Sequence, residues 1–416
     1  MLSVRYVLKT LLGPWALLAV IPLEVTNFVL RGMPWRGETL WTTDWFAITL
    51  FITGPILCGA AAVDAARLSR DGNFHLVSAV PRPYRPYLRA AAWAALPAVA
   101  VHVITVCVAL VFGGFYGDFS ATWTAVALLV QCAALCWYVA MGSAVGRFAG
   151  PLVAGIAAAA GSFAFSYFFS YPEDSFGLLD LGGATVSRLG YEYRPAYLLT
   201  QLVLFTVTAV VALLVVPSIS SGIRVPSRAG TAALGAVLAA VVLSPQVPLT
   251  DRLSSHPVRP TQCVGKAPKI CVYPEHHRVN DRTVEYVETL VRAARSAGYA
   301  ALVPDRVDVM SRTYRPQNPG VQGLEVDPDG YDSGVVDIRS IADSLTTPYH
   351  CDALYDDSRP PGDRYWIRHH SLTKTLLDAA DVRFDDGEYI PGSQVLTPEA
   401  AGSVVADFKS CALETP

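Results

Sequence analysis

Long apolar runs separated by short polar segments occupy the first 250 residues of the chain. Most runs are close to 20 residues long, about the length that an α-helix needs to cross a bilayer. The first run is too long for a secretory signal and lacks a small-x-small cleavage site, so it is interpreted as a membrane span. Seven spans are predicted, at residues 11–30, 45–66, 90–112, 123–145, 151–170, 196–216 and 231–249. The seventh is the weakest, because Pro245 and Pro248 crowd its outer end.

After residue 250 the long apolar runs give way to shorter segments in which apolar and polar residues alternate. Apolar positions predict a buried strand at 269–273 and helices at 281–297, 364–380 and 398–412, with Asn280 and Thr397 as helix caps. Shorter strand-like pieces are expected at 300–303, 307–310, 323–326 and 334–338. The predicted fold is an α-helical polytopic membrane bundle of about seven spans, residues 1–250, followed by a small α+β domain, residues 251–416.

Composition agrees with membrane residence and excludes several functions. Charged residues make up 16% of the 416 residues, against about 25% in an ordinary soluble domain, and the mean hydropathy is +0.36. With a net charge of -3 and no large basic block, nucleic-acid binding is not expected. There is no GxxxxGK[ST] loop, no GxGxxG after a strand and no nucleophile elbow, so neither a cofactor nor a catalytic residue is predicted.

The loop between the second and third predicted spans, residues 64–89, concentrates positive charge. Its arginines and the aromatic residue of its short amphipathic run are Arg67, Arg70, Phe74, Arg82, Arg85 and Arg89. Such a segment either lies on the membrane surface, docks on a soluble partner or is a simple solvated connector. Because positive residues collect on the cytoplasmic side, the N-terminus and this loop are predicted to be cytoplasmic. An odd number of spans then places residues 251–416 outside the cytoplasm.

Cysteine usage fits this placement. Four cysteines lie in predicted spans, where they act as small apolar residues, and Cys263, Cys271, Cys351 and Cys411 lie in the tail. An even set in an exported domain predicts two disulfides, although three pairings are possible. We favour Cys263–Cys271 and Cys351–Cys411.

Polar residues inside predicted spans are candidates for function. Glu24 lies in the first span, His102 in the third and Gln131 in the fourth. A Glu–His pair is able to relay protons, while the alternatives are interhelical hydrogen bonds or a polar patch along a substrate path. Asp64 and Arg67, one helical turn apart, are expected to pair with each other.

Small residues recur at a spacing of four at the end of the fourth span, at Gly142, Gly146 and Gly150. This spacing permits close helix approach. Packing within the bundle is the favoured interpretation, and a dimer contact is the alternative.

Six of the eight histidines lie in the tail, which raises the question of a zinc site. Their spacing matches no known zinc motif, since Glu275-His276-His277 is not HExxH. A site built from His277, His350 and His369 stays open as an alternative to surface or capping histidines, and no metal is predicted.

The first 220 residues resemble the permease subunits of type-2 ABC exporters, a family of bacterial drug, lantibiotic and polysaccharide exporters. Residues 66–90, ARLSRDGNFHLVSAVPRPYRPYLRA, are similar to the family's coupling helix. The long segment 171–197, between the fifth and sixth spans, is similar to the part that carries re-entrant helices in the family. The seventh span and the tail domain depart from that pattern.

The resemblance implies a multi-pass protein of the bacterial cytoplasmic membrane that works as a homo- or heterodimeric permease. It also implies a separate ABC ATPase, bound through the arginine-rich loop, and export of a peptide, drug or lipid-like substrate. The alternatives are a membrane-anchored extracytoplasmic sensor or binding module and, less favoured, an anchored metal hydrolase.

Overall fold

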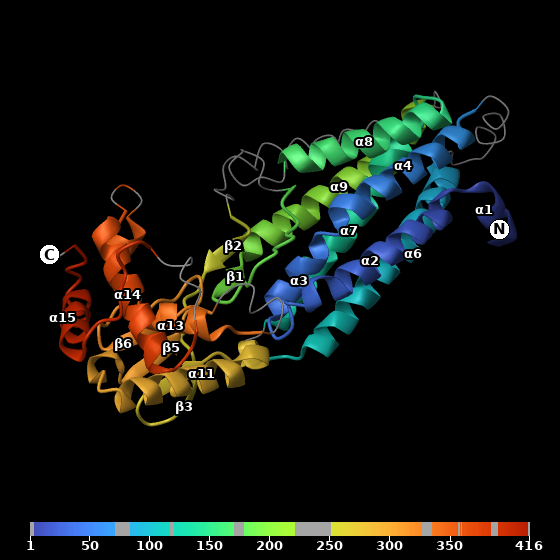
Figure 1. Ribbon diagram of the computed structural model, residues 1–416. Helices are drawn as coiled ribbons and strands as arrows, with labels where there is room; N and C mark the ends of the chain where they lie inside the picture. The colour runs from blue at the N-terminus through green and yellow to red at the C-terminus, as the bar shows by residue number, and fades with distance from the viewer. Residues whose placement is uncertain are drawn as a thin grey trace.

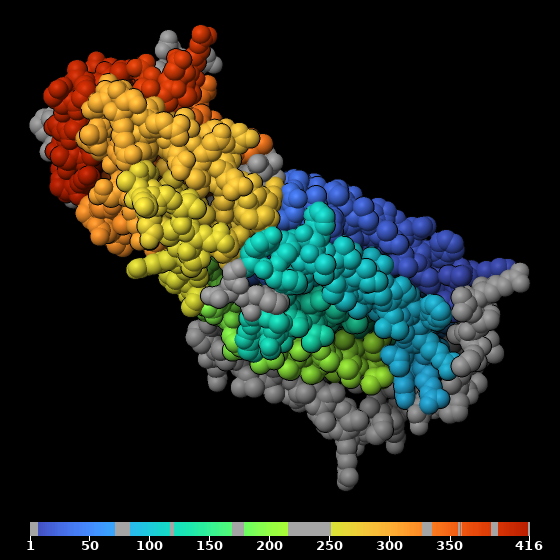
Figure 2. Space-filling model, turned by 90° about the horizontal axis from the view of Figure 1, so that it is seen from below, coloured from blue at the N-terminus to red at the C-terminus, as the bar shows by residue number. Residues whose placement is uncertain are grey.

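The computed structural model describes residues 4–70, 84–116, 120–169, 179–220, 251–326, 335–356, 358, 360–383 and 390–414. An elongated helical bundle carries the tail domain at one end, while the N-terminal helix α1 (Val4–Thr10) lies at the other (Figure 1). Seen from below, the tail again covers only one end of the bundle (Figure 2).

Six helical stretches in the described part of the chain are long and apolar enough to cross a membrane. They are Gly13–Gly32, Thr39–Leu68, Tyr84–Gly113, Ala121–Val145, Pro151–Phe168 and Pro195–Leu214. They contain η1 (Gly13–Ala16), α2 (Leu17–Val29), η2 (Leu30–Gly32), α3 (Thr39–Ala47), α4 (Leu50–Leu68), α6 (Tyr84–Gly113), α7 (Ala121–Val145), α8 (Pro151–Phe169) and α9 (Pro195–Ser220). The first six predicted spans are thus present as helices, and the seventh lies outside the described residues.

The second span begins earlier than predicted. Its first helix, α3, starts at Thr39 instead of residue 45 and includes the carboxylate Asp44, which is fully buried. Hydropathy alone ends a span at a charged residue, and here a partner from the tail neutralises that charge.

Apolar side chains cover much of the outer surface of the bundle. On α8, Leu152, Val153 and Ile156 are 63–76% exposed, as are Leu96 and Val111 on α6. Exposed apolar surface of this extent is rare on soluble proteins but normal against lipid. The helices therefore fit a membrane protein.

The tail domain is built on a small mixed sheet. Its strands are β3 (Gln262–Val264), β4 (Lys269–Val272), β5 (Arg306–Val309) and β6 (Val321–Leu324), in that spatial order. Strands β3 and β4 are antiparallel, whereas β4, β5 and β6 run parallel. The helices and short turns around it are η5 (Pro274–His276), α11 (His277–Ser296), η6 (Ala300–Leu302), α13 (Ile338–Thr346), η7 (Asp352–Tyr355), α14 (Asp363–Ala379) and α15 (Pro398–Lys409).

Three local predictions in the tail were wrong. Residues 300–302 form the 3₁₀ turn η6 instead of a strand. Of the strand expected at 334–338, residue 334 lies outside the described residues, 335–337 are irregular, and α13 begins at Ile338, capped by the Asp337 side chain, which accepts from the Arg339 amide. Helix α11 begins at His277, so Asn280 lies inside it and donates to the Tyr273 carbonyl oxygen at 2.6 Å. Short apolar runs fit strands and helices equally well, and capping contacts decide between them. Thr397 does cap α15, by accepting from the Ala400 amide.

Tail and bundle are joined by backbone pairing as well as by packing. Strand β1 (Tyr191–Tyr193), which precedes α9, pairs antiparallel with β2 (Leu253–Ser255), the first element of the tail. This two-stranded ladder fixes the start of the tail against the same end of the bundle at which α9 begins (Figure 1).

Candidate functional site

The C-terminal end of α4 and the N-terminal end of α6, on either side of the connection between these helices, lie at the end of the bundle that is remote from the tail (Figure 1). Arg67, Arg70, Arg85 and Arg89 are exposed, and Arg67 donates to the Thr10 carbonyl oxygen at 3.0 Å. Phe74 and Arg82 fall outside the described residues. The described arginines therefore present positive charge to the surroundings on both sides of the connection.

Asp64 forms the expected ion pair with Arg67 and also makes two shorter contacts to backbone amides. Its two carboxylate oxygens accept from the backbone amides of Leu12 and Gly13, at 2.7 and 2.8 Å, while the Arg67 guanidinium is 3.9 Å away. These amides are at the start of the first span, where a helix leaves N–H groups without partners. Asp64 thus ties the end of α4 to the beginning of the first span.

The three polar residues predicted inside spans lie together. His102 on α6 bonds through Nδ1 to Glu24 Oε1 on α2 (2.9 Å) and through Nε2 to Gln131 Oε1 on α7 (3.0 Å). All three side chains are buried. Thr49 Oγ1 also donates to Glu24 Oε1, and Gln131 Nε2 donates to the Thr43 carbonyl oxygen.

This cluster fits interhelical hydrogen bonding and leaves one group unused. Glu24 Oε2 is buried and makes no hydrogen bond within the described residues. The proton relay therefore stays a hypothesis for this cluster, beside a polar patch along a substrate path.

Two of the three spaced glycines allow close helix contact. A Cβ atom added at Gly142 would collide with the Cys58 carbonyl oxygen, and one at Gly146 with that of Ala62. A Cβ atom at Gly150 would meet nothing within 4 Å. The glycines at 142 and 146 therefore let α7 pack against α4 inside the bundle.

The tail contains two disulfides, Cys263–Cys271 and Cys351–Cys411. The first joins paired positions of β3 and β4. In the second, Cys351 lies directly before η7 and Cys411 lies two residues after the end of α15. Both are the pairings favoured from sequence.

The three histidines considered for zinc occupy different environments. His277 stacks on Tyr116 of the bundle with ring centroids 4.3 Å apart, whereas His350 Nε2 lies 3.3 Å from the Lys409 carbonyl oxygen. The described part of the chain brings His350 close to Cys351 and Cys411, but these two sulfurs are joined in a disulfide and are not thiolate ligands.

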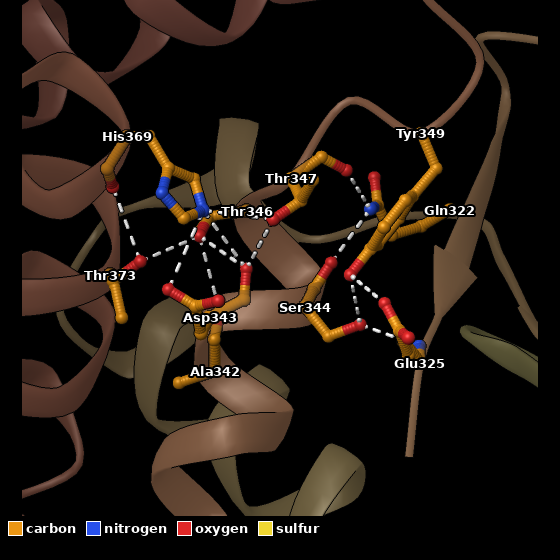
Figure 3. Close-up of polar contacts among 10 residues, drawn as sticks. All are labelled: Gln322, Glu325, Ala342, Asp343, Ser344, Thr346, Thr347, Tyr349, His369 and Thr373. Atoms are coloured by element: carbon orange, nitrogen blue, oxygen red, sulfur yellow. Dashed lines mark hydrogen bonds and ion pairs between the residues drawn. The ribbon is translucent and has the colours of Figure 1, made fainter. Parts of the chain in front are cut away.

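The third of these histidines, His369, belongs to a polar cluster around the end of α13 (Figure 3). Its Nε2 lies 2.9 Å from Thr347 Oγ1 and 3.2 Å from the Asp343 carbonyl oxygen. In the same cluster Gln322 Nε2 donates to the carbonyl oxygens of Ser344 and Thr347. These contacts satisfy carbonyl groups that a helix leaves open at its C-terminal end, so His369 has a structural role.

The junction between tail and bundle contains a buried ion pair. Arg252, in the first residues of the tail, binds both carboxylate oxygens of Asp44 on α3, with Arg252 Nη1 to Oδ1 at 2.8 Å. Tyr193 of β1 donates to the same Oδ1 at 3.0 Å, and Asp180 Oδ2 is 3.7 Å from Arg252 Nε.

Burial and charge–charge interactions shift the pKa values of Asp180 and Arg252. Burial raises the pKa of Asp180, an effect that Arg252 partly offsets. Burial alone would lower the pKa of Arg252, but Asp44 and Asp180 outweigh it and hold that pKa well above the ordinary value. Arg252 is therefore a permanent cation on which the carboxylates converge.

A second buried contact lies nearby. Glu38 Oε1 is 3.0 Å from His276 Nε2 of the tail and accepts from Ser187 Oγ at 2.6 Å. Its Oε2 accepts from the Arg188 amide at 2.9 Å. These contacts form one polar junction, which consists of the pairs Asp44–Arg252 and Glu38–His276. The junction joins three parts of the chain: the loop between spans five and six, the start of α3, and the tail.

Sequence reasoning missed this junction. Asp44 and Glu38 were assigned to a loop before the second span, and Arg252 to the start of the tail. The available signal was a carboxylate directly before an apolar run, which is costly near a membrane unless it has a partner. The partner is more than 200 residues away in sequence, so only the tertiary structure identifies it.

Two cavities lie at the junction. One, of about 390 Å³, is lined by Arg31 and Trp41 of the bundle and by loops of the tail. The other, of about 560 Å³, lies between the segments 188–195 and 254–258 and includes Glu38 and Trp123. Both volumes are in the range of small-molecule sites, roughly 300–1,000 Å³.

The chain matches no protein-family model, no curated protein and no solved structure. Its function therefore has to be argued from these sites.

Proposed function

We propose that the chain is the membrane subunit of an ABC-type exporter that pairs with a separate ATPase and exports a peptide, drug or lipid-like substrate. The observation that carries the proposal is the set of exposed arginines, Arg67, Arg70, Arg85 and Arg89, on either side of the α4–α6 connection. The end of α4 and the start of α6, which carry them, lie at the end of the bundle opposite the tail (Figure 1). Their place between the second and third spans is also that of the coupling helix in the exporters that the chain resembles.

In this proposal the arginine-rich end is cytoplasmic and the tail is extracytoplasmic. The positive charge at one end and the two disulfides at the other support this orientation. Binding of ATP brings the two ATPase subunits together, and they push the arginine-rich loops of a homo- or heterodimeric permease. The energy for alternating access comes from the different affinity for nucleotide in the two states.

The orientation requires that a seventh span, at 231–249, return the chain to the outer side. Helix α9 starts beside β1 and runs for 26 residues, a rise of about 39 Å. Strand β2, which begins at Leu253, is again paired with β1. Since the chain leaves the junction along α9 and is back at the junction by β2, a membrane-crossing segment between them is the simplest connection.

Co-purification tests the proposal. The detergent-solubilised protein is isolated from its native host as wild type and with Arg82, Arg85 and Arg89 changed to Glu. We expect an ATPase to accompany the wild type and to be lost from the variant, because charge reversal turns attraction into repulsion. A matched control changes three exposed arginines of the tail, Arg282, Arg292 and Arg295, to Glu and should keep the ATPase. An ATPase absent from every sample would overturn the proposal.

One observation favours the second candidate, a membrane-anchored extracytoplasmic sensor or binding module. The tail is fixed to the bundle by buried polar contacts, and cavities of ligand size lie along that contact. Deletion of residues 255–416 separates the candidates. If export or resistance is unchanged by the deletion, the tail has no part in transport. If the deletion abolishes a response to a ligand and no ATPase partner is found, the sensor is supported.

A further inference from the structure

The 390 Å³ cavity lies at a particular edge of the tail sheet. Strands β4, β5 and β6 are parallel, so their carboxyl ends share one edge. Residues that follow the strands line the cavity: Met310–Arg315 come directly after β5, Glu325 comes directly after β6, and His276 ends the 3₁₀ turn η5 that follows β4. In open sheets of parallel strands, ligands bind outside the carboxyl ends of the strands.

The bundle closes the cavity from the other side. Arg31, in the 3₁₀ turn at the end of the first span, and Trp41 of α3 line it together with residues 185–187. The cavity exists only where tail and bundle meet, so a ligand inside it contacts both.

Positive charge dominates the walls. Three arginines line the cavity, Arg31, Arg312 and Arg315, against one carboxylate, Glu325. The hydroxyl groups of Ser311 and Thr313 are further lining groups that can donate hydrogen bonds. His276 also lines the cavity, with its Nε2 3.0 Å from Glu38 Oε1.

The Arg315 guanidinium is fixed by two neighbours, while one of its nitrogen atoms has no hydrogen-bond acceptor within the described residues. Its Nη2 donates to Asp352 Oδ1 at 2.6 Å, and its guanidinium lies 4.0 Å from the centre of the Tyr355 ring. Its Nη1 is buried and makes no hydrogen bond within the described residues. A buried donor without an acceptor is costly unless a ligand satisfies it, and a guanidinium that is already oriented loses little freedom on binding.

We propose that this cavity binds a phosphate group, with Arg312 and Arg315 of the tail and Arg31 of the bundle as its cationic contacts. Several guanidinium groups together with hydroxyl donors suit a multiply charged oxyanion. The volume exceeds that of phosphate alone, so the ligand carries a further part that packs against Trp41 and Tyr314. Two sources share this chemistry, the headgroup of an anionic phospholipid and a soluble phosphate ester. The inference rests on the junction and not on a partner ATPase, so either proposal can fail without the other.

The test uses the full-length protein in two arms. Native mass spectrometry measures retention of phosphatidylglycerol against phosphatidylcholine, and thermal unfolding is followed with glycerol phosphate against glycerol. We expect the wild type to prefer the anionic probe in at least one arm. Arg312→Gln and Arg315→Gln should each weaken that preference by about tenfold, the effect of losing ~1.4 kcal/mol of binding free energy.

Two further variants keep the result interpretable. Arg292→Gln removes an exposed arginine of α11 outside the cavity and should leave binding unchanged. Arg315→Gln also breaks the hydrogen bond to Asp352, so part of its effect could be structural. Arg312 is exposed, and Arg312→Gln leaves the Arg315–Asp352 hydrogen bond intact. A response only to lipid assigns the headgroup, and a response only to glycerol phosphate assigns the soluble ester. No anionic preference in either arm, or one that survives Arg312→Gln together with Arg315→Gln, overturns the proposal.

Discussion

Single residues at the junction decide how the tail is attached. Asp44 and Arg252 are almost completely removed from water, and the cost of burying each charge is offset by the other. Glu38 and His276 repeat the arrangement a short distance away. Removing one member of such a pair leaves the other charged and unpaired, which is far more costly than losing a surface ion pair.

Asp44→Asn should therefore destabilise the protein by about 3 kcal/mol, because Arg252 stays buried with only Asp180, 3.7 Å away, as a counter-charge. Asp251→Asn provides the matched control. Asp251 and Arg194 form a mostly exposed pair at 3.7 Å, and this change should cost only about 0–1 kcal/mol. Denaturant unfolding of the detergent-solubilised full chain measures both. Equal and small losses would show that the buried pair does not hold the junction.

The intramembrane cluster gives a second prediction at this scale. In Glu24→Gln the amide can still accept from Thr49 and keep a hydrogen bond to His102, so stability should change by less than about 1 kcal/mol. Glu24→Ala leaves His102 Nδ1 buried without a partner, while Thr49 keeps the Phe46 carbonyl oxygen, and should cost about 1–3 kcal/mol. Thermal unfolding measures stability, and a transport or ligand-response assay on Glu24→Gln tests the proton hypothesis. Full activity in that variant rules out a proton on Glu24 as part of the mechanism.

At the scale of elements, helix α4 is the centre of the bundle. It packs against α7 and α8 through residues with little or no side chain, among them Gly59, Gly142, Gly146 and Gly155. In a membrane the hydrophobic effect does not hold helices together, so close backbone approach and the resulting van der Waals contact have to.

Gly142→Val and Gly146→Val should each lower the yield and thermal stability of the folded protein, because a side chain there meets the α4 backbone. Gly150→Ala belongs to the same spaced set but points into open space, so it should behave as wild type. Size-exclusion profiles and thermal unfolding in detergent compare the three. If Gly150→Ala were as harmful as the other two changes, Gly150 would have to contact a second chain, as in a dimer interface.

The two disulfides should differ in their contribution to the tail. Cys351–Cys411 spans 60 residues and Cys263–Cys271 only 8. In the loop-entropy description these lengths correspond to about 4 and about 2.5 kcal/mol. Cys351→Ser with Cys411→Ser should therefore lower the unfolding temperature of the tail more than the other double change, measured by limited proteolysis during heating. The opposite order would mean that contacts of β3 outweigh chain entropy.

At the scale of the whole molecule, one end of an apolar bundle is closed by a small domain while the other end carries exposed arginines (Figure 1). The contact between tail and bundle includes buried polar pairs, whereas the sides of the bundle are apolar. Helix α3 is shared between two polar sites, because its Thr43 carbonyl oxygen accepts from Gln131 of the intramembrane cluster and its Asp44 binds Arg252.

Acid should weaken this contact through His277. Burial, with Arg278 and Arg36 close by, lowers the pKa of His277 below its usual 6.5. The unfolded chain then takes up a proton more readily than the folded one, so stability is full above about pH 6.5 and falls as the pH drops further. His277→Asn should show a smaller loss of melting temperature between about pH 7.5 and 5.5 than wild type, with His350→Asn as the control. An unchanged pH dependence in His277→Asn would exclude this role.

The sequence by itself determined the features that depend on local pattern. Apolar runs of span length identified six helices, and capping by Thr397 set the start of α15. The presence of two disulfides in the tail followed from its four cysteines, whereas the choice among three pairings was settled by the fold in favour of the preferred one. Local patterns suffice here because a helix in lipid satisfies its own backbone groups within one segment.

Only the tertiary structure decided what depends on distant partners. The parallel pairing of β4, β5 and β6, the pairing of Asp44 with Arg252 and the cavity between tail and bundle all join segments far apart in the chain. Asp64 pairs with its neighbour Arg67 as its local sequence predicts, but its two shorter contacts, to the amides of Leu12 and Gly13, join segments about 50 residues apart. A charge next to an apolar run shows that a partner is needed, but nothing local specifies which one, because the choice is made by burial in the folded molecule.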